Sequence, residues 1–344
     1  LEPDGVHEAS RIEPALDAAP QFQGRRDAGP TDSAVKPIPV QERITLKVTD
    51  VEDRGPRNFA RAITRNTRLV YLESPANPTL VLTDIAAVAA IAKAKKIPVL
   101  VDNTFCTPYL QNPLELGADI VLHSATKYIG GHGTSIGGVI VESGRFDFAN
   151  GNFPMLTEPS PAYHDLRFWE NFREYAYLTR ARVELLRDIG ASMSPFNSFL
   201  LLLGLETLGL RMQRHVDNTR RVVAFLQEQE MVSTVAYPEL EGHPDRELAQ
   251  RLLPRGCGAV FSFDLEGGRE AGVAFVDALS LFSHLANVGD AKTLAIHPAS
   301  TTHSQLSAEQ LAESGITDAM VRLSIGIEHI DDIIGDIEQA IKGS

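Results

Sequence analysis

Cysteine is scarce in this chain, and its scarcity bears on the compartment in which the protein works. Only Cys106 and Cys257 occur among the 344 residues. Two cysteines cannot build a disulfide framework, and such a composition is typical of a reducing compartment. The sequence also lacks an apolar run long enough to cross a bilayer, and its first residues lack the basic and apolar regions of a secretory signal. We therefore expect a cytoplasmic protein without a membrane partner.

Positive charge is also in short supply. Lysine and arginine total 32 against 45 aspartates and glutamates, which leaves a net charge of −13. An acidic surface repels nucleic acids and anionic membranes, so we expect neither as a partner.

Neither cysteine has a recognisable histidine partner, and His297 and His303 lack the cysteine or acidic companions of a metal site. We therefore expect neither a cysteine nucleophile nor a metal.

The length is sufficient for about two domains with full cores. Proline and glycine break any long element in residues 1–42, which predicts an irregular N-terminal arm. Over residues 43–197 strand and helix patterns alternate with short connections, as is typical of an α/β domain with a mostly parallel sheet. Residues 198–344 are expected to hold a linking helix and a smaller C-terminal α+β domain.

Hydrophobic periodicity and turn residues predict the individual elements. Strands are expected near Ile44 and at 69–73, 98–101, 119–123, 136–141, 258–265, 294–296 and 321–325. Helices are expected at 57–63, 83–96 with Thr83 as cap, 163–189 with a possible break, 195–229, 270–281 and 330–341, with a loop at 154–161. The run 198–205 is apolar on every side, so we expect the helix that contains it to be buried.

One lysine lies just beyond the end of a predicted strand. Lys127 is preceded by the hydroxyls of Ser124 and Thr126 and is closely followed by three glycines. A lysine held out of bulk water becomes a usable amine nucleophile, while hydroxyls and backbone N–H groups bind phosphate. A Walker loop would need Gly-Lys-Ser/Thr, and a dinucleotide fingerprint would need glycine in place of Ile136, so both motifs are excluded. The pattern favours a phosphorylated ligand that reacts with an amine, and the alternative is a solvated loop lysine.

Polar residues also end two neighbouring strands, at 73–77 and at Asp102. Parallel strands present their carboxyl ends at one edge of a sheet, where ligands bind. The combination predicts a site for pyridoxal 5′-phosphate, in which Lys127 reacts with the aldehyde and Asp102 pairs with the protonated ring nitrogen. Ser124 and Thr126 would hold the phosphate and Asn77 the phenolic oxygen. Ordinary turn or cap residues are the alternative for each of these positions.

Arg322 lies within an apolar strand pattern, where a guanidinium needs an anionic partner. The α-carboxylate of an amino acid suits its planar fork of donors. An internal ion pair is the alternative.

Four motifs, taken in order, resemble those of the Cys/Met-metabolism PLP-dependent enzymes. They are YLESPANP at 71–78, VDNTF at 101–105, HSATKYIGGHG at 123–133 and VRLSIGIE at 321–328. The resemblance extends over residues 44–340, and within the family the stretch 287–305 is most similar to O-acetylhomoserine sulfhydrylases. It implies fold type I of the PLP-dependent transferases, the aspartate-aminotransferase-like α/β fold.

The resemblance also implies roles for single residues and a reaction. Lys127 is implied as the catalytic Schiff-base lysine, with Asp102, Ser124, Thr126 and Asn77 as cofactor contacts and Arg322, Asn77 and Thr293 as substrate contacts. The implied reaction is γ-replacement on O-acetyl-L-homoserine by sulfide or a thiol, which gives L-homocysteine, in a homodimer or homotetramer. Cystathionine γ-synthase or γ-lyase activity is the alternative, and the thiol acceptor and the ester stay open.

The sequence departs from the family at its beginning. Relatives carry a Tyr-x-Arg segment, an Ala/Ser-Ser-Gly-x-Ala phosphate loop and a ring-stacking tyrosine before the first motif, and residues 1–70 contain none of them. The resemblance therefore implies an incomplete cofactor domain that binds PLP more weakly than relatives do and turns over little substrate. A truncated, catalytically inactive remnant is the alternative from another functional class.

Overall fold

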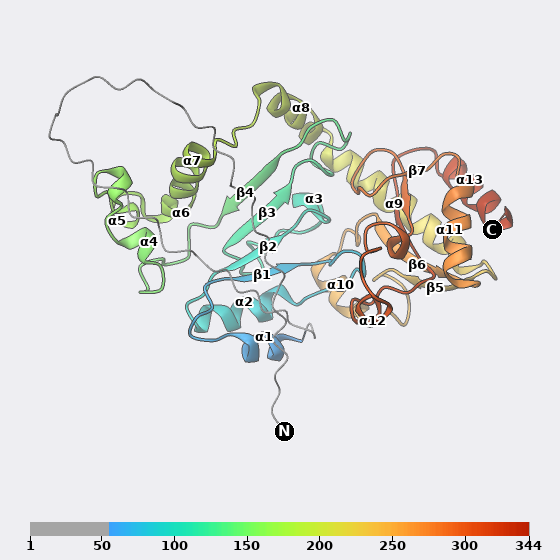
Figure 1. The fold of residues 1–344 in the computed structure, drawn as a ribbon, viewed down its shortest axis with the longest axis horizontal. Helices are drawn as coiled ribbons and strands as arrows, with labels where there is room; N and C mark the ends of the chain where they lie inside the picture. Colours follow the sequence, from blue (N-terminus) through green and yellow to red (C-terminus); the bar gives the residue numbers. More distant parts are fainter. Residues whose placement is uncertain (1–54, 344) are drawn as a thin grey trace, which may run out of the picture. The chain divides into compact units, whose positions relative to one another are not determined.

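The structure is a computed structural model in which residues 55–343 are described (Figure 1). The irregular arm predicted for residues 1–42 and the strand predicted near Ile44 lie outside the described residues. The described part contains a four-stranded sheet and a five-stranded sheet. No helix within it is both long and apolar enough to span a bilayer.

The first sheet has the strand order β1-β2-β3-β4. Its strands are β1 (Val70–Glu73), β2 (Val99–Asp102), β3 (Ile120–Ser124) and β4 (Gly138–Glu142). Strands β1, β2 and β3 are parallel, as predicted, whereas β4 is antiparallel to β3. Valine is the commonest residue in these strands, as expected because β-branched side chains pack well on a pleated surface.

Helices α1 (Pro56–Ala62) and α2 (Ile85–Ala94) accompany this sheet, and α3 (Thr107–Leu110) follows β2 (Figure 1). The apolar side chains of α2 form one buried cluster with those of β1 and β2, so α2 covers one face of the sheet. The prediction that Thr83 caps the N-terminus of α2 is wrong.

The N-terminus of α2 is capped by Asp84, whose carboxylate accepts a hydrogen bond of 3.2 Å from the Ala87 N–H. Thr83 cannot take this role because it lies one residue further from the helix, and its own N–H donates to Ser74 Oγ at 3.0 Å. A cap residue satisfies N–H groups that have no partner within the helix.

Residues 154–189 form a series of short helical segments, so the loop predicted at 154–161 is partly helical and the helix predicted at 163–189 is interrupted, as its possible break allowed. The segments are α4 (Pro154–Thr157), η1 (Pro161–Tyr163), α5 (Phe168–Phe172), η2 (Arg173–Tyr175), α6 (Ala176–Arg180), η3 (Ala181–Leu186) and α7 (Arg187–Ile189). Arg173 has a φ of 48°, which a continuous right-handed helix cannot contain. Phe148, Phe153 and Phe168 are buried together here, so side-chain packing outweighs local periodicity.

The helix predicted over 195–229 is divided at Thr207 into α8 (Pro195–Glu206) and α9 (Leu208–Gln227). Helix α9 is amphipathic, and its buried residues, among them Met212 and Val216, belong to the main apolar core. That core also contains side chains of the second sheet.

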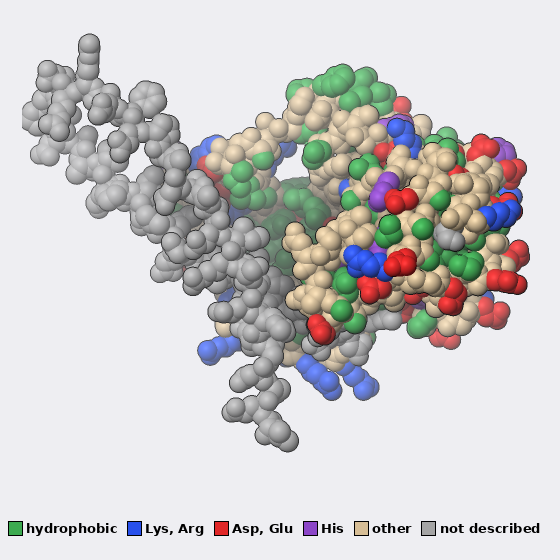
Figure 2. Space-filling view, turned by 45° about the vertical axis from the view of Figure 1, so that its right-hand side comes forward, with side chains coloured by type: hydrophobic (Ala, Val, Ile, Leu, Met, Phe, Trp, Pro, Cys, Tyr) green, Lys and Arg blue, Asp and Glu red, His purple; other side chains and the backbone are tan. Residues whose placement is uncertain are grey.

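Helix α8 is not buried as predicted. Of its residues only Leu201 and Gly204 are buried, whereas Phe196 is 66% exposed and Leu202 is 60% exposed. Apolar side chains gather over α8 at the top of Figure 2. An apolar helix is buried only where another element packs on it. Among the described residues no element covers the exposed apolar face of α8.

The second sheet has the strand order β5-β6-β9-β8-β7. Its strands are β5 (Val232–Ala236), β6 (Val260–Leu265), β7 (Ser283–His284), β8 (Leu294–Ile296) and β9 (Met320–Ser324). The helical elements that accompany it are α10 (Arg246–Leu252), α11 (Gly268–Ala278), η4 (Pro298–Ser300), α12 (Ala308–Glu313) and α13 (Ile330–Gly343). Pairing is antiparallel except between β7 and β8. Strands β5 and β7 and helices α3, α10 and α12 were not predicted. The predicted domain boundary at residue 197 falls inside α8 and stays a prediction.

Candidate active site

The carboxyl ends of β1, β2 and β3 lie at one edge of the first sheet because the three strands are parallel. Glu73 at the end of β1 is in register with Asp102 at the end of β2. Ser124 ends β3, and Lys127 follows three residues later in a turn whose Lys127 N–H donates to the Ser124 carbonyl at 3.1 Å. The sheet therefore brings together side chains that lie far apart in sequence.

Asp102 accepts hydrogen bonds from donors on two sides. Thr104 donates to Asp102 Oδ1 through its backbone N–H at 3.0 Å and through its hydroxyl at 2.5 Å. The Tyr71 hydroxyl donates to Asp102 Oδ2 at 3.3 Å. Thr104 Oγ1 also accepts from the Ser124 N–H at 2.8 Å and so ties β2 to β3. The Asp102 carboxylate is thereby held in one orientation.

Glu73 is the second carboxylate at this edge. Burial, with a smaller contribution from the charge of Asp102, raises the pKa of Glu73 from 4.5 to about 7, although the Asn77 N–H lowers it. Burial and the same neighbouring carboxylate raise the pKa of Tyr71 to about 12. Glu73 is therefore only partly ionised at neutral pH.

The amine of Lys127 is half-buried and donates a hydrogen bond to Asn287 Oδ1. Burial lowers the pKa of Lys127, and the positive charge of Arg322 lowers it further. Both causes make the amine easier to deprotonate, which a nucleophilic lysine requires.

Arg322 lies on β9 and is 6% exposed. Its Nη1 donates to Asn77 Oδ1 at 3.0 Å, and its Nη2 donates to the Asn287 carbonyl at 3.1 Å. Burial lowers the pKa of Arg322 to about 10, so the guanidinium is still charged at neutral pH. Among residues 55–343 it contacts amide oxygens and no carboxylate, so the internal ion pair considered above does not form there.

The two predicted phosphate hydroxyls differ in what they contact. The Thr126 hydroxyl donates to the Gly137 carbonyl at 3.2 Å and accepts from the Gly137 N–H at 3.0 Å. The Ser124 hydroxyl has no hydrogen-bond partner in the described part of the chain. Ser124 is thus free to bind a ligand, whereas Thr126 would exchange a bond to Gly137 for one to a phosphate.

Thr293 makes no hydrogen bond to these side chains among the described residues. It is fully buried, and its hydroxyl donates to Glu328 Oε2 at 2.9 Å and accepts from the Gly326 N–H at 2.9 Å. Its suggested contact with substrate stays a prediction.

The chemistry of these groups fits pyridoxal phosphate. Lys127 offers an amine with a lowered pKa, and Asp102 offers a fixed carboxylate on the neighbouring strand. Within residues 55–343 neither Lys127 nor Arg322 is neutralised by a carboxylate, so the site favours anionic groups such as a phosphate and a substrate carboxylate.

Sequence reasoning missed three residues of this cluster: Thr104, Tyr71 as a partner of Asp102, and Asn287. Thr104 stands only two residues after Asp102, a spacing at which side chains of turn residues commonly bond to each other, so a local signal existed. Tyr71 and Asn287 reach their partners only through the tertiary structure.

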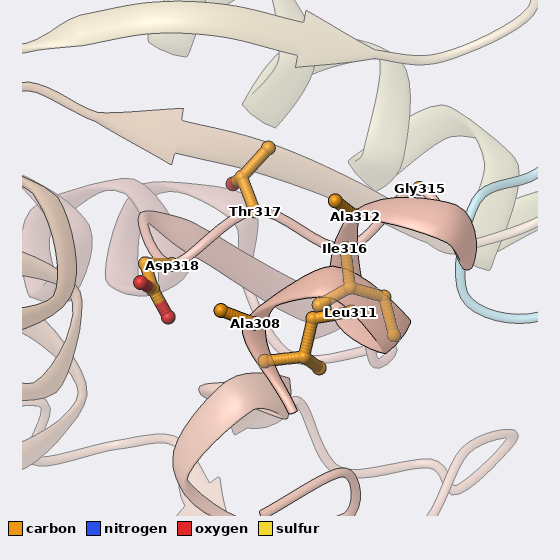
Figure 3. Close-up of a pocket in the computed structure, with 7 residues that line it drawn as sticks. All are labelled: Ala308, Leu311, Ala312, Gly315, Ile316, Thr317 and Asp318. Atoms are coloured by element: carbon orange, nitrogen blue, oxygen red, sulfur yellow. The ribbon is translucent and has the colours of Figure 1, made fainter. Parts of the chain in front are cut away.

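A cavity of about 380 Å³ lies elsewhere, beside α12 (Figure 3). It is lined by Ala308, Leu311, Ala312, Gly315, Ile316, Thr317 and Asp318. Its one charged side chain, Asp318, pairs with Arg269 at 3.5 Å. No residue of the cluster around Lys127 lines this cavity, and it offers no group of polar side chains for catalysis.

Known proteins similar to this chain were found by sequence and by structure. Residues 29–342 match the family described as Cys/Met metabolism PLP-dependent enzyme. The chain is 48% identical over 309 residues to the O-acetyl-L-homoserine sulfhydrylase of Leptospira meyeri, covering 87% of this chain and 70% of that protein. It is 49% identical over 302 residues to the homocysteine synthase of Schizosaccharomyces pombe, again covering 87% and 70%.

A crystal structure from Campylobacter jejuni, assigned as an O-acetylhomoserine (thiol)-lyase, is similar with a TM-score of 0.81 and 38% sequence identity. The match covers 85% of this chain and 70% of that one. The Campylobacter protein contains a lysine joined to pyridoxyl phosphate.

Proposed function

Because the chain belongs to the Cys/Met metabolism PLP-dependent enzymes, we propose that it catalyses γ-replacement on O-acetyl-L-homoserine, in which sulfide or a thiol displaces acetate to give L-homocysteine or a homologue. The expected fold, that of the type I PLP-dependent transferases, is confirmed by the similarity to the Campylobacter protein. The observation that carries the proposal is the cluster of Lys127, Asp102 and Arg322, linked through Thr104, Ser124 and Asn287.

When bound, pyridoxal phosphate supplies an aldehyde for amines and a ring that accepts electrons from the α-carbon. Lys127 is the residue that would hold it covalently, Asp102 would pair with its protonated ring nitrogen, and Ser124 with Thr126 would hold its phosphate. Asp102 is suited to this role because Thr104 and Tyr71 fix its orientation. A carboxylate that is already oriented needs little rearrangement during the reaction.

Arg322 would bind the α-carboxylate of the amino-acid substrate. Its guanidinium is held by Asn77 and by the Asn287 carbonyl, so the fork of donors is positioned before substrate arrives. Lys127 and Arg322 both contact Asn287, so a substrate bound by Arg322 would present its α-proton to the Lys127 amine, which would take the proton and return it. During the replacement the Cγ–O bond breaks, acetate leaves, and the sulfur forms a bond to Cγ.

The test measures the product directly. Purified chain is incubated with pyridoxal phosphate, O-acetyl-L-homoserine and sulfide, and homocysteine is quantified by mass spectrometry, with the Lys127→Ala variant as the control. We expect homocysteine from the unmodified chain and none above background from Lys127→Ala. Cystathionine formed only when cysteine replaces sulfide would point to a γ-synthase, and no product with any acceptor would point to an inactive remnant.

We also propose that the chain self-associates. Support comes from α8, where Phe199 is 55% and Leu202 is 60% exposed, and from the exposed apolar side chains Val139 and Ile140 of β4. Large contiguous apolar surfaces on soluble proteins mark interaction sites. A second copy of the chain would remove these side chains from water, as expected for a homodimer or homotetramer.

We further infer that the protein works in a reducing compartment such as the cytoplasm. Cys106 and Cys257 are both unpaired and buried. Burial raises the pKa of each thiol well above its usual value, which keeps both protonated and unreactive.

A further inference from the structure

Asn287 contacts both positive side chains of the candidate site. It lies in the loop between β7 and β8, and its side-chain Oδ1 accepts a hydrogen bond from the Lys127 amine. Its backbone carbonyl accepts a hydrogen bond of 3.1 Å from Arg322 Nη2. One residue thus holds Lys127 through its side chain and Arg322 through its backbone.

The loop that contains Asn287 packs closely against the turn that contains Lys127. Two residues further on, Gly289 has a φ of 76°, and a Cβ there would lie 2.8 Å from the Tyr128 nitrogen and 2.9 Å from Lys127 Cβ. The Gly289 N–H donates to Ser324 Oγ on β9 at 3.1 Å. The loop is therefore closely packed on both sides, so the position of Asn287 is set by its surroundings.

We propose that Asn287 is a positioning residue of the active site, whose amide oxygen orients the Lys127 amine while its backbone carbonyl orients Arg322 toward the substrate carboxylate. This role deepens the proposed function and rests on it. An asparagine orients the amine without adding a negative charge, whereas an aspartate would hold the amine as an ammonium ion. An amide at this position therefore orients the Lys127 amine without the increase in its pKa that a carboxylate would cause.

The titratable groups that face this pair are few. Arg322 approaches Lys127 from β9, and His303, from the segment after η4, interacts with Arg322. Burial raises the pKa of the neighbouring Tyr128 well above its usual value, so this phenol is neutral. None of these groups is negatively charged at neutral pH, so an Asn287→Asp substitution would introduce the first carboxylate to contact the amine among the described residues.

The test measures the reactivity of Lys127 in the full chain after hydroxylamine has removed any bound pyridoxal phosphate. Acetic anhydride labels lysines at a series of pH values, and mass spectrometry follows the Lys127 peptide with Lys292 as an internal reference. Asn287→Asp and Asn287→Ala are compared with the unmodified chain. Asn171→Asp, which makes the same chemical change at an exposed position of α5, is the matched control.

We expect Asn287→Asp to raise the pKa of Lys127 by about one unit, which slows labelling at pH 8 by about tenfold. Asn287→Ala removes an acceptor that favours the ammonium form and should speed labelling, and Asn171→Asp should match the unmodified chain. The proposal is overturned if Lys127 in both Asn287 variants is labelled at a rate within twofold of that in the unmodified chain, with circular dichroism unchanged. Because neither cofactor nor substrate is present, the result decides the role of Asn287 even if the homocysteine assay fails.

Discussion

Lys127 and Arg322 are two positive side chains of one site that are held by neutral amides instead of carboxylates in the described part of the chain. Burial of unneutralised charge is costly, so a protein keeps such an arrangement where a ligand supplies the opposite charge. The phosphate of the cofactor and the carboxylate of the substrate are two anions that would do so. Binding of these anions should therefore stabilise the folded chain.

Arg322→Lys tests the role of the guanidinium. A lysine offers a point charge in place of two parallel bonds, and one charged hydrogen bond is worth about 1.5–3 kcal/mol. We expect the KM for O-acetyl-L-homoserine to rise by about ten- to a hundredfold, while the affinity for pyridoxal phosphate, read by absorbance titration, stays the same. Loss of the cofactor with an unaltered KM would instead assign Arg322 to cofactor binding.

Glu73→Gln tests the linkage between protonation and stability. The folded chain raises the pKa of Glu73 to about 7 from 4.5, so it favours the neutral acid. The stabilising contribution of the neutral form is present below pH 4.5 and is lost as pH rises through about 7. A glutamine stays neutral, so Glu73→Gln should match the unmodified chain at pH 4.5 and have the higher Tm at pH 8.

Calorimetry from pH 4.5 to 8 checks this expectation, with the exposed Glu115→Gln as the control whose Tm curve should follow the unmodified chain. Parallel Tm curves for Glu73→Gln and the unmodified chain would show that Glu73 ionises freely in the fold.

At the scale of elements, α2 shows how a local signal and a long-range contact combine. Asp84 caps the helix, and its second carboxylate oxygen pairs with Arg251 of α10 at 2.6 Å. Loss of an N-cap costs about 1 kcal/mol, and an ion pair that is partly exposed adds less. The cap is therefore the larger effect.

Asp84→Ala should lower the free energy of unfolding by about 1 kcal/mol. Asp84→Asn keeps a capping oxygen and should lose clearly less, since only the ion pair with Arg251 is weakened. Urea unfolding followed by circular dichroism measures both variants. Equal losses in the two variants would mean that the ion pair, and not the cap, stabilises this end of α2.

At the scale of the whole molecule, the apolar side chains of α8 and β4 face solvent in the single chain. The double variant Phe199→Ser with Leu202→Ser removes two of the exposed side chains of α8. We expect it to lower the mass measured by light scattering to that of a smaller assembly while the circular dichroism spectrum stays that of the folded chain, because these residues are 55% and 60% exposed in the single chain.

Leu201→Ser is the matched control from the same helix. Leu201 is only 7% exposed, so this change should lower the Tm. If light scattering shows the unmodified chain to be a monomer, the proposed self-association is wrong.

Local sequence patterns predict much of the first sheet and of the candidate site. The strands that end at Glu73, Asp102 and Ser124 are predictable because β-branched runs and turn residues are local signals. Parallel pairing then brings their carboxyl ends to one edge, so the sequence pattern alone assigns Lys127 and Asp102 to one site. The family resemblance rests on the same local motifs.

The contacts of these side chains depend on long-range packing. Lys127 and Asn287 are 160 residues apart, and no periodicity connects them. Local apolarity predicts that α8 is buried, but burial depends on a neighbouring surface that the segment does not encode. Likewise, the hydroxyl of Thr293 bonds Glu328 within the core because the fold, and not the motif, sets its direction. Sequence patterns indicate which surfaces are apolar or polar, whereas long-range packing determines what each of these surfaces contacts.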